Sequence, residues 1–226
     1  MIEYQNLTLI GTSHISTQSI KEVRETIFEQ KPAFVALELD KGRLIGLMGK
    51  KQRLKIRSIR KLGLGGFLFA FFGSWISTKL GKVVGTKPGD EMKTAVLSAI
   101  KVKSRIALID QEISITIRRL IKQITWKEKF RFVGDLVKGL VFRKQEIKPF
   151  DLRKVPSEEL INIMVQHVEK RYPSVYKVLI DERNKYMAKK LIHLMQQYPE
   201  DKIIAVVGAG HQKGMIELIK KSISAS

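Results

Sequence analysis

Short apolar runs rich in β-branched residues alternate along the chain with longer stretches whose apolar positions recur at helical spacing. Four such runs stand out, over residues 7–10, 33–39, 105–109 and 202–207. Their length and composition predict buried strands. Between the first two runs, Val23 and Ile27 fall on one face of a predicted helix that stops before Pro32. A strand, a helix and a strand within about 30 residues are typical of a parallel pair.

Helical spacing dominates the rest of the chain. Helices are predicted from Asp90 onward, after Ser157 as a cap, beyond Pro173, and from the last strand to about Lys221. The alternation of strands and helices predicts an α/β fold. We expect a mostly parallel central sheet of about four core strands, flanked by helices, with a helical insertion in the middle of the chain.

The length and composition fit one folded domain. With 226 residues and 44% hydrophobic residues, the chain can bury a sizeable core. We expect a single domain over residues 1–226, with a basic helical insertion at about 41–86 and 111–156. The absence of cysteine excludes disulfides, thiolate catalysis and cysteine-ligated metal centres, so any metal must be held by histidine and carboxylate. The first residues lack a basic stretch followed by an apolar one, which predicts a cytoplasmic protein.

A large positive charge is the most conspicuous feature of the composition. Lys and Arg number 42 against 22 Asp and Glu, which gives a net charge of +20. Such a charge favours phosphate backbones or anionic lipid head groups as partners. Residues 41–61 and 128–148 are rich in these basic side chains, whereas residues 62–77 carry no charge.

The uncharged residues 62–77 leave three interpretations open. The segment is shorter than the roughly 20 residues that span a bilayer. It is therefore a core helix, a homodimer contact or a membrane-surface segment. For the basic regions we expect an anionic membrane surface, with peripheral membrane association, rather than nucleic acid. The reason is that the sequence holds no aromatic–basic RNA motif and no helix-turn-helix pattern.

Two histidines follow predicted strands in the same way. His14 follows the first strand in the sequence GTSH, residues 11–14, and His211 follows the last in GAGH, residues 208–211. Ligands of open parallel sheets bind outside the carboxyl ends of the strands, so both imidazoles are expected at one edge. A single G-x-x-H turn is also an ordinary way to start a helix. Two copies at matched strand ends favour a functional site.

Two carboxylates follow the second predicted strand. Glu38 lies at its end and Asp40 two residues later, on the same side of the pleat. Two histidines and a carboxylate suit a divalent transition metal that keeps open positions for water. They equally suit metal-free hydrolysis, with histidine as general base and glutamate as orienter or acid. His167 and His193 lack such neighbours on their predicted helices, and we expect them to be structural or exposed.

Six blocks of sequence, in this order and spacing, resemble one protein family. They are residues 11–16, 35–43, 87–96, 107–120, 181–191 and 205–215. The chain resembles the TraB/PrgY (pheromone-shutdown) family, within the wider superfamily of Tiki, TraB, erythromycin esterase and ChaN-like proteins. The resemblance implies an α/β fold of pseudo-symmetric halves whose cleft holds two G-x-x-H histidines, a strand-end glutamate and one or more arginines. In this chain these positions are His14, His211 and Glu38, with Arg183 and Arg43 as the candidate arginines.

Two positions differ from the pattern that the resemblance implies. Similar proteins often have Arg where Gln111 stands, and often Glu-Arg-Asp where this chain has Glu-Arg-Asn at 182–184. Many relatives are also longer and end in transmembrane helices. We therefore expect a soluble short form of the family.

The Tiki relatives imply a metal-dependent hydrolase of the peptidase or amidase kind. In this hypothesis His14, Glu38 and His211 hold a divalent metal such as Mn²⁺ or Co²⁺ and a water molecule, and Arg183 stabilises the developing oxyanion. The expected partner is a peptide or small-molecule ligand. The alternative is a non-enzymatic protein that sequesters such a ligand at the membrane surface. Supporting roles are expected for residues next to the motifs, namely Gly11, Gly208, Gly210, Asp40, Arg43 and Glu182.

Overall fold

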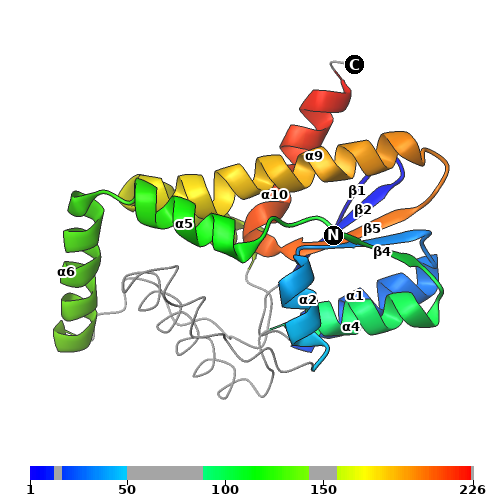
Figure 1. The fold of residues 1–226 in the computed structure, drawn as a ribbon, viewed down its shortest axis with the longest axis horizontal. Coiled ribbons are helices and arrows are strands. Elements are labelled where there is room, and N and C mark those ends of the chain that lie inside the picture. The colour runs from blue at the N-terminus through cyan, green and yellow to red at the C-terminus, as the bar shows by residue number, and fades with distance from the viewer. Residues whose placement is uncertain (13–16, 50–88, 143–156, 225–226) are drawn as a thin grey trace.

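A mostly parallel sheet lies between two layers of helices (Figure 1). The structure is a computed structural model, and it describes residues 1–12, 17–49, 89–142 and 157–224. Its strands are β1 (Ile2–Tyr4), β2 (Leu7–Thr12), β3 (Phe34–Leu37), β4 (Arg105–Leu108) and β5 (Ile203–Gly208). They lie in the order β1-β2-β5-β3-β4, with β1 antiparallel to β2 and every other pair parallel. The predicted α/β class is confirmed.

The four predicted strands are β2, β3, β4 and β5, and β1 is an addition to them. β1 has only three residues, and the chain turns back after it through Gln5, whose φ is +52°. A segment this short gives almost no periodic signal, so the alternation that marks the other strands could not reveal it. β1 pairs with β2 from Ile2 opposite Leu9 to Tyr4 opposite Leu7.

Helices connect the strands and carry the middle of the chain. They are α1 (Thr17–Gln30), α2 (Lys41–Leu47), α4 (Asp90–Lys101), α5 (Ile113–Gln123), α6 (Trp126–Phe142), α7 (Glu158–Arg171), α8 (Pro173–Tyr176), the π-helical turn η1 (Lys177–Asp181), α9 (Glu182–Gln197) and α10 (Ala209–Ile223). Ser157 caps α7 as predicted, since its hydroxyl accepts the Leu160 N–H at 3.3 Å.

The described part of the helical insertion expected at 111–156 forms two helices, α5 and α6, which are separated at residues 124–125. Ile124 has an extended backbone, with φ −62° and ψ 122°, and ends α5. The Glu128 carboxylate then accepts the Thr125 N–H at 2.9 Å and its hydroxyl at 2.8 Å, while Thr125 Oγ1 accepts the Glu128 N–H at 3.2 Å. This exchange is a capping box, which starts α6 in a new direction.

Each face of the sheet packs against its own pair of helices. Along β5, Ile203 and Ala205 point to the side covered by α9 and α10, and Ile204 and Val206 point to the side covered by α1 and α4. The alternation follows from the two-residue repeat of a strand. On the first side, α9 presents a buried stripe at helical spacing that consists of Met187, Leu191 and Met195.

Most of the expected insertion lies outside the described residues. Of 41–86 the structure describes α2 and the residues to Gly49, so the core, dimer and membrane interpretations of 62–77 stay predictions. Within the described ranges, we find no helix that combines the length and apolarity needed to cross a membrane.

The buried stripe of α9 should hold the sheet and the helix together. We expect Leu191→Ala to lower the free energy of unfolding by about 2–5 kcal/mol, because Leu191 is fully buried and its truncation leaves a cavity. Leu97→Ala on α4 is the matched control. The Leu97 side chain is 43% exposed, so its truncation should lower the free energy of unfolding by no more than about 1 kcal/mol. Urea unfolding measures both, and equal losses would contradict this packing.

Candidate functional site

The guanidinium of Arg183 is the centre of a polar cluster at the carboxyl-end edge of the sheet. Its Nε donates to Asp110 Oδ1 at 3.2 Å, and its Nη2 donates to Asp110 Oδ2 at 2.8 Å and to Glu38 Oε1. Its Nη1 is 3.0 Å from His211 Nε2 and 3.2 Å from the carbonyl oxygen of Leu179, to which it donates. One side chain of α9 thus joins the segments that follow β3, β4 and β5.

Two neighbours stabilise the carboxylate of Glu38, namely the guanidinium of Arg183 and the N-terminus of α10. The residue follows β3 directly and is 2% exposed. Its Oε1 accepts from Arg183, and its Oε2 accepts the Gly208 N–H at 2.6 Å, where Gly208 is the N-cap of α10. A carboxylate at a helix N-terminus is stabilised by the helix dipole and by the unpaired N–H groups there.

The hydrogen bonds of His211 define its tautomer. A guanidinium donates and does not accept, so His211 Nε2 must carry the lone pair toward Arg183. The proton is then on Nδ1, which donates to Asn184 Oδ1 at 2.7 Å. The ring is buried and neutral, and Nε2 is also 3.5 Å from Glu38 Oε1. A neutral imidazole with an inward lone pair is the form that a general base requires.

The charges of the cluster balance. Glu38 and Asp110 are buried, and Arg43 donates from Nη1 to Asp110 Oδ2 at 2.9 Å, so two guanidiniums face two carboxylates. Burial acts to lower the pKa of Arg183, but the charges and hydrogen bonds of Glu38 and Asp110 outweigh it and raise the pKa above its usual value. Arg183 is therefore a permanent cation at any physiological pH.

Two glycines allow α10 to approach its neighbours closely. A Cβ on Gly214 would stand 2.5 Å from Asn184 Nδ2, and a Cβ on Gly11 would stand 2.6 Å from Gln212 Oε1. The first close approach holds Asn184 against His211. The second lets Gln212 donate to the Leu9 carbonyl at 2.9 Å, which attaches α10 to β2.

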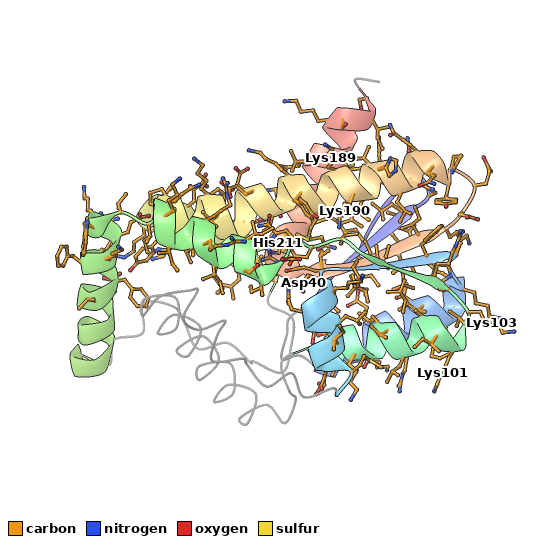
Figure 2. The ribbon with its side chains drawn as sticks, in the orientation of Figure 1. Asp40, Lys101, Lys103, Lys189, Lys190 and His211 are labelled. Carbon is orange, nitrogen blue, oxygen red and sulfur yellow. The ribbon has the colours of Figure 1, made fainter. Side chains whose placement is uncertain are left out.

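The two G-x-x-H turns leave adjacent parallel strands. In the register of β2 and β5, Thr12 pairs with Gly208, so both strands end level with each other. At this edge Asp40 is the N-cap of α2 and His211 lies in the first turn of α10, and both are labelled in Figure 2. The structure describes β2, which leads to His14, but His14 itself lies outside the described residues.

Comparisons with known proteins decide the family. The sequence model of the TraB/PrgY/gumN family matches residues 2–222. The chain belongs to this family. It is 35% identical, over 96% of its length, to the protein named Uncharacterized protein MJ1365 of Methanocaldococcus jannaschii. It is 25% and 24% identical, over 92% of its length, to the TraB domain-containing proteins of Homo sapiens and Mus musculus.

The chain corresponds to part of these relatives. It spans 54% of the length of the Methanocaldococcus jannaschii protein and 61% of the length of the two mammalian proteins. The family match extends over both G-x-x-H turns and the described cluster between them.

Of the residues expected from the family pattern, the structure brings Glu38, Arg183 and His211 together. Arg43 joins them through Asp110. Asp40 instead caps α2, because its Oδ1 accepts the N–H groups of Gly42 at 2.6 Å and Arg43 at 3.0 Å.

Glu182 does not join the cluster. Its carboxylate accepts from Arg119 at 2.6 and 2.7 Å and from Gln123 at 3.3 Å, so it binds α9 to α5. Consecutive helical residues point about 100° apart, which explains why Glu182 and Arg183 serve different surfaces.

Two members of the cluster were missed by the sequence reasoning. Asp110 follows the third predicted strand just as Glu38 follows the second, and this strand-end signal could have revealed it. Asn184 had no such signal. The neighbouring Gln111 turns away, since its Nε2 donates to Thr116 Oγ1 at 2.9 Å. Position 111 therefore supplies no guanidinium to this edge, and Arg183 does so from α9. His167 and His193, expected to be structural or exposed, are both exposed.

Some atoms of the cluster are of the kind that binds a metal ion. Among the residues whose side chains the structure describes, no group of three or more His, Cys, Asp and Glu is arranged to hold one. His211 Nε2 and Glu38 Oε1 are 3.5 Å apart, close to the roughly 3.4 Å between two ligands of a tetrahedral ion at about 2.1 Å. Their spacing fits, but both atoms accept hydrogen bonds from Arg183.

The tautomer of His211 can be tested by NMR. We expect the ¹⁵N shifts of His211 to show a protonated Nδ1 and an unprotonated Nε2, with the signals assigned from a His211→Ala spectrum. Asn184→Asp should raise the pKa of His211, because it places a negative charge beside Nδ1. The ¹⁵N signals of His193, which is exposed on α9, serve as the internal reference in all three spectra. A protonated Nε2 would contradict the assigned hydrogen bonds.

Proposed function

We propose that the protein is a hydrolase that cleaves an amide or ester bond in a peptide or small-molecule ligand. The observation that carries the proposal is the contact of Arg183 with Glu38, Asp110 and His211 at the edge where a parallel sheet binds its ligands. Hydrolysis of an acyl group needs a base for the water and a positive charge for the oxyanion. His211 and Arg183 supply these two groups side by side.

In this proposal the hydrogen bond between Arg183 and His211 is exchanged for one to the substrate. Arg183 Nη1 turns its donation from His211 Nε2 to the carbonyl oxygen, which frees the lone pair of Nε2 to accept a proton from water. The water oxygen attacks the carbonyl carbon. The negative charge that develops on the carbonyl oxygen faces Arg183. His211 Nε2 then gives the proton to the leaving nitrogen or oxygen atom, as the bond between that atom and the carbonyl carbon breaks. Asn184 fixes the ring throughout, because it holds Nδ1–H at 2.7 Å.

A metal-dependent version of the same hydrolysis is the second candidate. It is favoured by the 3.5 Å separation of His211 Nε2 and Glu38 Oε1, and it would use His14 as the third ligand. An ion such as Mn²⁺ or Co²⁺ bound there would supply a water of lowered pKa. Arg183 would have to give up its hydrogen bonds to His211 Nε2 and Glu38 Oε1 so that these atoms could bind the ion. It would remain as the group that stabilises the oxyanion.

The test is hydrolysis of a panel of p-nitrophenyl esters and of a mixed peptide library followed by mass spectrometry. We expect His211→Ala to lower kcat/KM by about 10²–10⁴-fold, because a general base is lost. His193→Ala is the matched control and should retain full activity, since His193 is exposed on the outer face of α9. Turnover that survives His211→Ala unchanged would contradict the proposal.

Metal content separates the two versions. In the metal-dependent version, protein purified without a chelator carries a divalent ion that His14→Ala and His211→Ala both lose, and EDTA abolishes turnover. In the metal-free version, turnover survives EDTA and the metal content of all three proteins is equally low. A ligand that binds to the intact cluster and is never cleaved would instead support the sequestering alternative.

A further inference from the structure

Helix α6 lies away from the sheet and carries an exposed aromatic face. Figure 1 shows it at the opposite end of the described structure from the loop between α9 and β5. Trp126 and Phe130 are 71% and 72% exposed, and Val133 is 57% exposed. They fall at positions i, i+4 and i+7, so they share one face of the helix. The rings of Trp126 and Phe130 lie 6.1 Å apart, centroid to centroid.

The acidic residues of α6 are all on its inner side. Glu128 is 3% exposed and, besides Thr125, accepts the Ser174 N–H at 2.8 Å. Asp135 accepts from Arg171 Nε at 2.6 Å and also from the Tyr172 hydroxyl. Burial acts to raise the pKa of Glu128, but the hydrogen bonds from Thr125 and Ser174 outweigh it and lower the pKa, so the inner carboxylate stays ionised at neutral pH. These bonds fix the rotation of α6 about its axis.

Lysines flank the outward face. Lys127 is exposed, and Lys129 Nζ lies 4.3 Å from the centre of the Trp126 ring. The outer surface of α6 thus combines large apolar side chains with positive charge. The carboxylates of Glu128 and Asp135 lie on the inner side, where they accept hydrogen bonds. A chain of net charge +20 adds to the attraction for an anionic partner.

We infer that this face of α6 docks on an anionic lipid surface. Tryptophan and phenylalanine enter the boundary between head groups and acyl chains, and flanking lysines pair with the head groups. Single-stranded RNA fits less well, because Val133 offers no plane on which a base could stack. A two-fold contact between copies of the chain fits less well too, because it would bring the same lysines together. The inference does not depend on the proposed hydrolysis.

The test is co-sedimentation of the full chain with vesicles of phosphatidylcholine and phosphatidylglycerol in equal parts. We expect binding at low salt that weakens as salt rises. Trp126→Ser with Phe130→Ser should weaken binding by about tenfold or more, because the apolar contact is lost. Lys127→Gln with Lys129→Gln should weaken it by about fivefold per lysine.

Matched variants elsewhere on the surface are the controls. Leu97→Ser with Ile100→Ser removes two exposed apolar side chains of α4, and Lys101→Gln with Lys103→Gln removes two exposed lysines. Figure 2 shows these lysines at the far end of the molecule from α6. Both control pairs should bind vesicles nearly as the unchanged chain does.

Three outcomes would overturn the inference. The first is no binding of the unchanged chain to the anionic vesicles at low salt. The second is equal loss of binding in the α6 variants and the control variants. The third is a halved molecular mass for Trp126→Ser with Phe130→Ser in size-exclusion chromatography, which would assign the face to a second copy of the chain.

Discussion

The buried guanidinium of Arg183 is the interaction on which the candidate site depends. A carboxylate that is buried without a partner is strongly destabilising, and Arg183 contacts two buried carboxylates, those of Glu38 and Asp110. Arg183 pairs with both carboxylates and contacts His211, and Arg43 supplies the second positive charge at Asp110. Since each of these residues belongs to a different segment, the one cation fixes how the ends of β3 and β4 and the start of α10 lie around α9.

The order of the strands makes this convergence possible. β5, the last strand in the sequence, is inserted between β2 and β3, so the turn that carries His211 lies between the ends of the first two core strands. Glu38 follows β3 and reaches the N–H of Gly208 across the neighbouring strand. The register also ends β2 level with β5, so both G-x-x-H turns begin at the same height of the sheet. A parallel sheet therefore brings residues nearly 200 positions apart in the chain to a single edge.

The sequence predicted those parts of the fold and the site that local patterns encode. Four strands were marked by apolar runs, and Glu38 and His211 by their positions after such runs. Asp110 has the same kind of position and was missed. The short β1, the bond between His211 and Asn184, and the outward turn of Glu182 depend on how elements pack, which no spacing along the chain encodes. The exposure of the aromatic face of α6 also depends on packing, because it follows from the anchoring of Glu128 and Asp135.

Arg183 and Glu38 act as one unit in the folded protein, and a double-mutant cycle measures how strongly they are coupled. The free energy of unfolding is measured by urea titration for the unchanged chain, Arg183→Met, Glu38→Gln and the double variant. We expect a coupling energy of at least about 2 kcal/mol, because Arg183→Met leaves the charge of Glu38 buried without its cation, and Glu38→Gln removes that charge. Losses that add to within about 0.5 kcal/mol would contradict it.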